Sequence, residues 1–229
     1  GPSKPEVLPS KKGYNRFTWD FRKDDLPSIN KVFIFGGHDG STVGPGKYTL
    51  RLDTEEHRSE TTATILPNPK VNGSMADYTE QQTVLNSIEA SVREIHIAVN
   101  AMRSAKSQLE QYGKLLKDNE AASALLKKGD SLKERITTWE ENLIQPKQKT
   151  FQDVINFPNK LNAQLLHLRG YVAAVEPKVT AGAKERLEDL LAQWQGYKRE
   201  HDLIVNQEMS AFNRLYKELD IPAIILDEN

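Results

Sequence analysis

The chain has 229 residues, a net charge of -1 and no cysteine, and its length fits one large domain or two modest ones. Its near-neutral charge lacks the basic footprint of a general nucleic-acid binder, and no apolar run approaches the length of a membrane span. The lack of cysteine excludes a disulfide framework, thiolate catalysis and cysteine-ligated metal sites. Composition therefore favours a soluble, polar, helix-rich protein without obvious catalytic equipment.

The start of the chain is typical of an excised fragment. Gly1, Pro2 and Ser3 resemble the remnant of a cleaved expression tag, and no apolar signal segment follows them. We expect residues 1–12 to form this remnant and a linking or disordered segment. A targeting signal that is missing from a fragment carries no information about location.

Residues 13–71 combine turn formers with β-branched and aromatic residues, which predicts several short strands. From Phe17 to Phe21 apolar and polar side chains alternate around Trp19, the period of a strand with one buried face. Three further strands are predicted at 31–35, 48–52 and 61–66. Four strands indicate a small β-sandwich, whereas a complete sandwich of this type uses about seven. We therefore expect either an incomplete sandwich or a small sheet lying on the helices.

A turn precedes the third predicted strand and consists of Gly44, Pro45 and Gly46. Glycine permits backbone angles that other residues avoid, and proline fixes its own φ. Tyr48 and Leu50 then alternate with polar residues. We expect Tyr48 to meet Trp19 across the sheet, so that the two rings form much of a small core. Arg16 and Asp20 lie on the opposite side of their strand and could pair there.

Residues 76–220 are rich in helix formers and poor in glycine, which predicts long helices. Their apolar residues recur at spacings of three and four, the pattern of one buried helix face. The helices are expected between Asp77 and Asp118, between Leu125 and Pro146, between Pro158 and Pro177, and between Thr180 and Leu219. Short connections favour an antiparallel up-down four-helix bundle whose outer helices, of roughly 40 residues each, are about 60 Å long. Residues 221–229 form a C-terminal tail.

Several residues are expected to shape these helices. Asp77 should cap the first helix, with Glu80 completing a capping box, and Thr180 should cap the last one. Pro158 should sit at the start of the third helix, where a missing N–H costs little. The apolar register of the last helix shifts between Tyr197 and Val205. The spacing also predicts that three side chains belong to the core, and these are Trp139, Leu161 and Trp194.

The histidines do not form a metal-binding pattern. None of the five falls in an HExxH or HxH motif, and they are His38, His57, His96, His167 and His201. His96 and His167 lie beside apolar positions of predicted helices, which favours partly buried or boundary histidines over metal ligands. The loop 36–41 superficially resembles a phosphate cradle, but it lacks the lysine of a P-loop and a following helix. A flexible strand connection is the favoured interpretation.

The acidic residues offer no catalytic pair. Glu55 and Glu56 are expected at a solvated hairpin tip, and Glu140 and Glu141 are neighbours on a helix and do not face one another. Neither pair is a credible glycosidase acid/base couple. Three further aspartates lack EF-hand spacing, and they are Asp24, Asp25 and Asp39. The sequence therefore predicts no catalytic, cofactor-binding or metal-binding residue.

Two segments of the first half resemble one known family. The segment from Gly13 to Arg22 resembles the G-x-N-R-F-x-W-D-x-R strand of large exported bacterial proteins that carry a sortilin-like propeller of BNR repeats. Those proteins are often labelled glycosyl hydrolases. The segment from Gly44 to Leu52 is similar to the family's A-P-G-x-Y-x-V-R-L hairpin, although Val43 and Gly44 stand where alanine is usual.

Two later segments resemble the same family in the same order. Residues 67–71 stand where the family has D-P-R, so an acidic residue is replaced here. Residues 157–162 are similar to the family's Y-P-x-K-L-N helix start. The resemblance implies the C-terminal region of such a protein, with an Ig-like sandwich (13–71) leading into a helical bundle (76–220). It also implies export to the periplasm or cell surface of a Bacteroidetes-type bacterium. Any glycosidase activity of the family lies in the propeller, which these residues do not include, so no catalytic residue is carried over.

The expected function is that of a non-catalytic accessory module. It would act as a spacer or protein–protein docking element, with the rest of a parent propeller protein and an unidentified envelope protein as partners. It would bind no nucleic acid and contain no membrane span. The alternative is a carbohydrate-binding module beside a glycoside hydrolase, which requires exposed aromatic residues. Trp19 is expected on an inner face, and this speaks against a sugar platform. An autonomous hydrolase is the least favoured interpretation because no carboxylate pair supports it.

Overall fold

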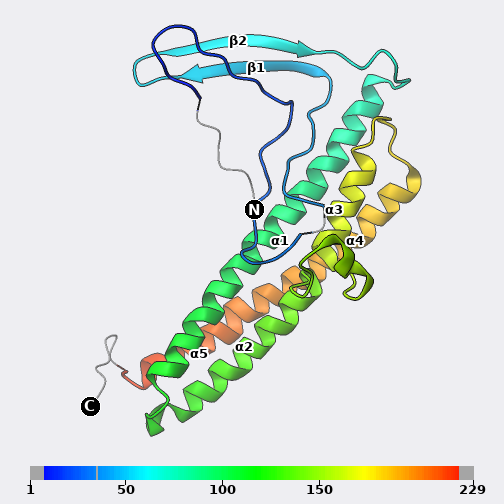
Figure 1. The fold of residues 1–229 in the computed structure, drawn as a ribbon. Coiled ribbons are helices and arrows are strands. Elements are labelled where there is room, and N and C mark those ends of the chain that lie inside the picture. The colour runs from blue at the N-terminus through cyan, green and yellow to red at the C-terminus, as the bar shows by residue number, and fades with distance from the viewer. Residues whose placement is uncertain (1–7, 35, 222–229) are drawn as a thin grey trace.

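The computed structural model describes residues 8–34 and 36–221 and shows a mainly helical chain with a two-stranded sheet (Figure 1). The strands are β1 (Gly46–Asp53) and β2 (Arg58–Ile65), and the helices are α1 (Met75–Leu115), α2 (Ser123–Leu143), α3 (Leu161–Val172), α4 (Ala181–Leu203) and α5 (Ser210–Glu218). Short 3₁₀ turns at Glu120–Ala122 and Phe151–Ile155 flank α2 and precede α3. Of the predicted terminal segments, residues 1–7 and 222–229 lie outside the described residues.

The helices form a rod with three tracks, which are three rows of helix that run side by side along its length. The 41 residues of α1 run the length of the rod, and α4 returns in the same direction as α1 and continues into α5. Both α2 and α3 pack against α1, but α3 packs against α4 whereas α2 also packs against α5. The two shorter helices therefore follow one another along the third track. The prediction of a helical bundle is confirmed, but the predicted four-helix cross-section is wrong because α2 and α3 share one track.

The last helix contains a π-helical turn at Ile204–Met209 that joins α4 to α5. A π turn adds a residue to the helical repeat and rotates the face that follows it. This turn lies where the apolar register was predicted to shift, after Tyr197. Ile204 is fully buried, and Phe212 of α5 is buried next to α2. The π turn therefore keeps the apolar face of one long helix directed at the core.

Helix caps follow the sequence with two corrections. The capping box of α1 is formed by Ser74 and Asp77, whose side chain accepts a hydrogen bond from the Ser74 backbone N–H at 2.8 Å. Asp77 therefore occupies the third position of the box and not the cap. Thr180 caps α4 as predicted. Pro158 lies outside α3, which begins at Leu161, and its carbonyl accepts a hydrogen bond from Gln145.

The predicted core residues of the bundle are buried. Trp139 is fully buried, and its indole Nε1 donates to the Tyr197 carbonyl at 2.8 Å. The indole of Trp194 donates to Glu94 at 3.0 Å. Leu161 is buried at the start of α3. A buried tryptophan needs a partner for its N–H, so these bonds fix how α1, α2 and α4 face one another.

The sheet is smaller than predicted. The strands β1 and β2 pair antiparallel from Gly46 opposite Ile65 to Asp53 opposite Arg58, and Glu55 and Glu56 occupy the exposed turn between them. The strands predicted at 17–21 and 31–35 are absent from the described residues, and Phe35 lies outside them. In the described part of the chain, neither segment has a neighbouring strand to complete a ladder: Trp19 contacts the hairpin at Tyr48, whereas Lys31 lies in a turn with a φ of 58° and Ile34 joins the bundle core.

Gly44, just before β1, and Gly46, its first residue, do not use the unusual backbone angles that glycine permits. Neither Gly44 nor Gly46 has a positive φ. A Cβ atom at Gly44 would stand 2.9 Å from Cγ of Gln82 on α1, so this glycine is needed for close approach of the chain to the helix. The Tyr48 hydroxyl donates to the Gly44 carbonyl at 2.6 Å and closes the same turn.

Candidate functional site

Residues 22–34 and 36–43 form a strap that lies along α1 and leads into β1 (Figure 1). Its two arms pair antiparallel: the N–H of Lys23 donates to the Ser41 carbonyl at 3.0 Å, and the N–H of Leu26 donates to the His38 carbonyl at 2.7 Å. Leu26, Ile29 and Ile34 are buried and join the hydrophobic core of the bundle. The strap is therefore a fixed part of the rod.

A polar stripe on α1 holds the strap. Its members recur at spacings of four and three, which places them on one face of the helix, and they are Gln82, Asn86, Glu89, Arg93, His96, Asn100 and Arg103. Five of these side chains bond to strap carbonyls, at Thr42, Asp25, Pro27, Ser28 and Asn30. The other two bind Lys23 and the Ser41 N–H. Side chains of α1 thus replace the neighbouring strand that an extended chain otherwise needs.

Charged groups secure the strap where it turns. Glu89 is buried; it accepts from the Ser41 N–H at 2.7 Å and lies 3.6 Å from the ammonium of Lys23. On the other side, the guanidinium of Arg169 donates to the carbonyls of Asp39 at 2.6 Å and Gly36 at 2.9 Å. Burial lowers the pKa of Arg169. These hydrogen bonds hold the loop 36–41 against α1 and α3.

His96 is the most deeply buried titratable group of this region. Its Nδ1 donates to the Pro27 carbonyl at 2.6 Å, and its Nε2 lies 3.5 Å from the amide of Asn162 on α3. Burial, together with nearby His38, lowers the pKa of His96 from 6.5 to about 4. At neutral pH the ring is therefore uncharged. This confirms the prediction of a buried structural histidine at this position, and His167 is exposed on α3.

The hairpin of β1 and β2 has one apolar and one charged face. On β1 the side chains of Tyr48, Leu50 and Leu52 share one face, and Lys47, Arg51 and Asp53 share the other. Neither strand packs against any helix, and Leu50 and Leu52 are 43% and 51% exposed. An exposed apolar row on a sheet face marks an interaction site more often than a free surface.

Aromatic residues that precede the strap extend this apolar face. The rings of Trp19 and Tyr48 meet edge to face at 5.8 Å, and Trp19 meets Phe21 at 5.2 Å. The predicted contact of Trp19 with Tyr48 is confirmed, but the rings form no closed core, because Phe17 and Phe21 are half-exposed. Asp20 pairs with Arg22 at 3.7 Å and not with Arg16. We call the continuous surface of Trp19, Phe21, Tyr48, Leu50 and Leu52 the hairpin patch.

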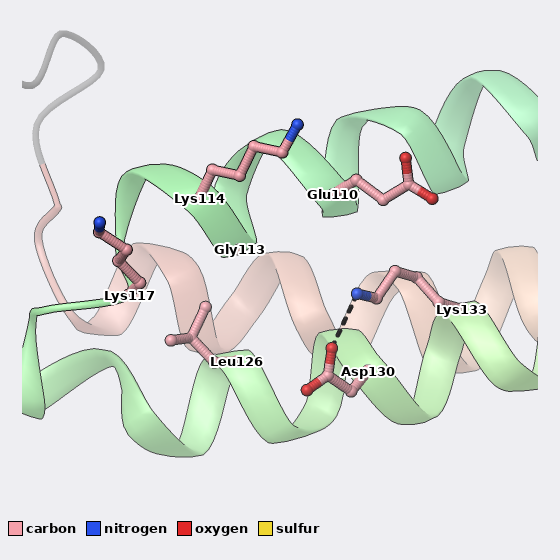
Figure 2. Close-up of a pocket in the computed structure, with 7 residues that line it drawn as sticks. All are labelled: Glu110, Gly113, Lys114, Lys117, Leu126, Asp130 and Lys133. Atoms are coloured by element: carbon pink, nitrogen blue, oxygen red, sulfur yellow. Dashed lines mark ion pairs between the residues drawn. The ribbon is translucent and has the colours of Figure 1, made fainter.

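The opposite end of the rod carries an open hollow between α1 and α2 (Figure 2). Its volume is about 450 Å³, and its lining includes Glu110, Lys114, Lys117 and Lys133. Lys133 extends along α2 to Asp130, one turn earlier on the same helix, and forms an ion pair with it at 2.8 Å. Solvated lysines and carboxylates of both signs line this surface, and it has no convergent set of catalytic groups.

Other predicted sites remain apart. Glu140 is buried and paired with Arg103 at 2.6 Å, whereas its neighbour Glu141 is exposed. Among the residues that the structure describes, no group of three histidines or carboxylates could hold a metal ion. Within the same residues, no helix has the length and apolar character that crossing a bilayer requires.

Comparison of the chain with protein-family models, with curated proteins and with solved structures found no match.

Proposed function

We propose that the chain is a non-catalytic accessory module of a larger exported propeller protein, in which it acts as a spacer and docking element of the cell envelope. The single observation that carries this proposal is the hairpin patch, an apolar surface of strands and aromatic rings that no helix of the described residues covers. Export and the propeller parent are supported by the resemblance of residues 13–22 and 44–52 to that family.

The construction of the molecule supports a docking role. The strap enters β1 and β2 runs into α1, so both ends of the hairpin are anchored on the rod. Anchoring sets the position of the patch before binding, which lowers the entropic cost of association. The three tracks behind it make a stiff support, because α1 spans the rod in one uninterrupted helix.

The proposed occupant of the patch is a β-sheet of the parent protein. Two sheets pack face to face when each offers a row of apolar side chains, and Leu50 and Leu52 offer such a row at the accessible face of β1. With a second sheet in place, residues 13–71 become part of an Ig-like sandwich. The opposite face, with Lys47 and Asp53, then faces solvent.

Binding between the chain and the separately produced remainder of its parent protein tests this proposal. Calorimetric titration is carried out with the wild type and with the double variant Leu50→Lys, Leu52→Lys. The control variant is Thr62→Lys, Thr64→Lys, which adds the same charge to the opposite face of the hairpin. We expect the leucine variant to bind at least about tenfold more weakly and the control to bind like the wild type. Equal binding by all three proteins would contradict the proposal.

A second candidate is a carbohydrate-binding module, and one observation favours it. Tyr14 is 90% exposed, and Phe17 and Phe21 are half-exposed, so the aromatic residues required for a sugar platform are more accessible than the sequence suggested. Electrophoresis of the chain through gels with and without polysaccharide distinguishes the candidates. Retardation that is lost in Tyr14→Ala and Phe17→Ala would favour sugar binding over docking.

A further inference from the structure

The outer edge of β1 is a second surface, distinct from the hairpin patch. In an antiparallel pair, hydrogen-bonded and non-hydrogen-bonded residues alternate. The N–H of Thr54 donates to the His57 carbonyl at 2.8 Å, so these two residues form a hydrogen-bonded pair. The next pair, Asp53 with Arg58, is then a non-hydrogen-bonded one, and the two kinds alternate from there to Gly46 and Ile65. Four residues of β1 therefore direct their N–H and C=O groups away from β2, and they are Lys47, Thr49, Arg51 and Asp53. Within residues 8–34 and 36–221 these groups have no backbone partner.

Such an edge is a template for another strand. A two-stranded hairpin is at best marginally stable in water, and three or more strands with an apolar face are needed for independent stability. No helix supports β1 or β2. The physical requirement is therefore a strand that runs beside β1 and supplies a sequence compatible with its charges.

The charges on β1 match a second copy of β1 in one antiparallel register. When Leu50 lies opposite Leu50 of the second copy, Lys47 lies opposite Asp53 of that copy, and the reverse pair forms by symmetry. Opposite charges that face one another across strands stabilise a pairing. On the other face, Tyr48 then lies opposite Leu52 of the second copy, so the two apolar faces become continuous.

Neighbouring registers do not offer this match. The residues that direct their backbone groups outward must pair with one another, so one strand can slide along the other only by two residues at a time. A shift of two residues in one direction places Lys47 opposite Arg51 of the second copy. A shift of two residues in the other direction places Arg51 opposite Arg51 of the second copy. Both bring like charges together, which destabilises a pair.

We propose that the chain self-associates through the outer edges of β1, which join two hairpins into a four-stranded antiparallel sheet of order β2–β1–β1–β2. The interface is isologous, as expected of a twofold dimer. Its area is small, so association is weak and depends on concentration. The hairpin patches of the two copies lie on the same face of the joined sheet and remain open.

Proline substitution tests the edge with a matched control. Thr49 and Thr62 face one another across the hairpin, and each directs its N–H outward, one at the β1 edge and one at the β2 edge. Proline removes a backbone donor but is tolerated on an edge. Sedimentation equilibrium up to about 1 mM detects even a weak pairing. We expect Thr49→Pro to weaken dimerisation at least about tenfold, and Thr62→Pro to leave it unchanged.

A charge exchange identifies the register. Asp53 also pairs with Arg51 at 2.8 Å and with Arg58 at 2.7 Å within its own hairpin, so renewed dimerisation of the mixed variants serves as the control that both hairpins are still formed. The variants Lys47→Glu and Asp53→Lys each bring like charges together in a homodimer, whereas a mixture of the two restores both opposite-charge pairs. We expect each variant alone to be monomeric where the wild type is half dimeric, and an equimolar mixture to dimerise again. A monomeric wild type at 1 mM, equal effects of the two prolines, or a mixture that stays monomeric would overturn the proposal.

Discussion

Acidification should release the strap from α1 because His96 must become charged in a buried site. The pKa of His96 is lowered to about 4 in the folded chain, from 6.5 when the ring is free in water. The folded state therefore resists protonation, while the unfolded chain accepts the proton below pH 6.5. Stability is unaffected above pH 6.5 and falls between pH 6.5 and about 4. At about 1.4 kcal/mol per pH unit, the loss reaches about 3 kcal/mol.

Other titratable groups near His96 also affect how stability depends on pH. His38 of the strap lies 6.2 Å away, ring to ring, and its pKa is also lowered by burial, so it acts in the same direction. Asn162 of α3 is uncharged, and the Pro27 carbonyl accepts the Nδ1 proton. The pKa values of some carboxylates are also lowered, those of Asp77 and Glu94 among them. Their protonation destabilises the folded chain mainly below pH 4.5.

Urea unfolding between pH 7 and 4 measures this loss. The variant His96→Gln keeps a side-chain amide that can donate to the Pro27 carbonyl but removes the titration, so its stability should depend much less on pH above 4.5. The variant His167→Gln, at an exposed position of α3, should keep the wild-type dependence. If His96→Gln and the wild type lose stability equally between pH 6.5 and 4.5, the buried neutral histidine is refuted.

Three further predictions concern the rod and the hairpin. Replacing Arg103 by Met leaves Glu140 buried without its cation and should lower the free energy of unfolding by about 3 kcal/mol, and the double change with Glu140→Gln should recover part of it in the same urea titration. Trp139→Phe removes the donor to the Tyr197 carbonyl and should cost about 1–3 kcal/mol, measured by thermal unfolding against Trp19→Phe, which should have little effect. Leu50→Lys should change the free energy of unfolding of the bundle by no more than about 0.5 kcal/mol, because no described helix contacts Leu50. Unfolding is followed by the circular dichroism of the helices, and a larger loss of stability would show that the hairpin supports the rod.

The helices could be predicted because their signals are local. Thr180 bonds the N–H of Ala183, three residues away, and the shift after Tyr197 marks the π turn that begins at Ile204. Trp139 and Trp194 were assigned to the core from spacing alone. The shared track of α2 and α3 could not be predicted from helical spacing, which gives the face of each helix but not its position along the rod; in the structure they have 21 and 12 residues and together lie beside the 41 residues of α1.

The strap could not be predicted from its own residues. Its carbonyls are recognised by α1, and a backbone carbonyl has no sequence signature. The signal lies on α1, where polar residues from Gln82 to Arg103 repeat at helical spacing beside the apolar stripe. Alternation around Trp19 was read as a strand because extended chain and a paired strand share the same period. For the same reason the hairpin patch was expected to be an inner face.

Amide hydrogen exchange, compared between this chain and its full-length parent, tests the docking account most directly. The account predicts that the amides of β1 and β2 exchange rapidly in the isolated chain and become strongly protected in the parent, while those of α1 and α4 are equally protected in both. Protection that is unchanged in the hairpin would contradict the account, because an apolar patch that stays uncovered in the parent protein cannot be its docking surface.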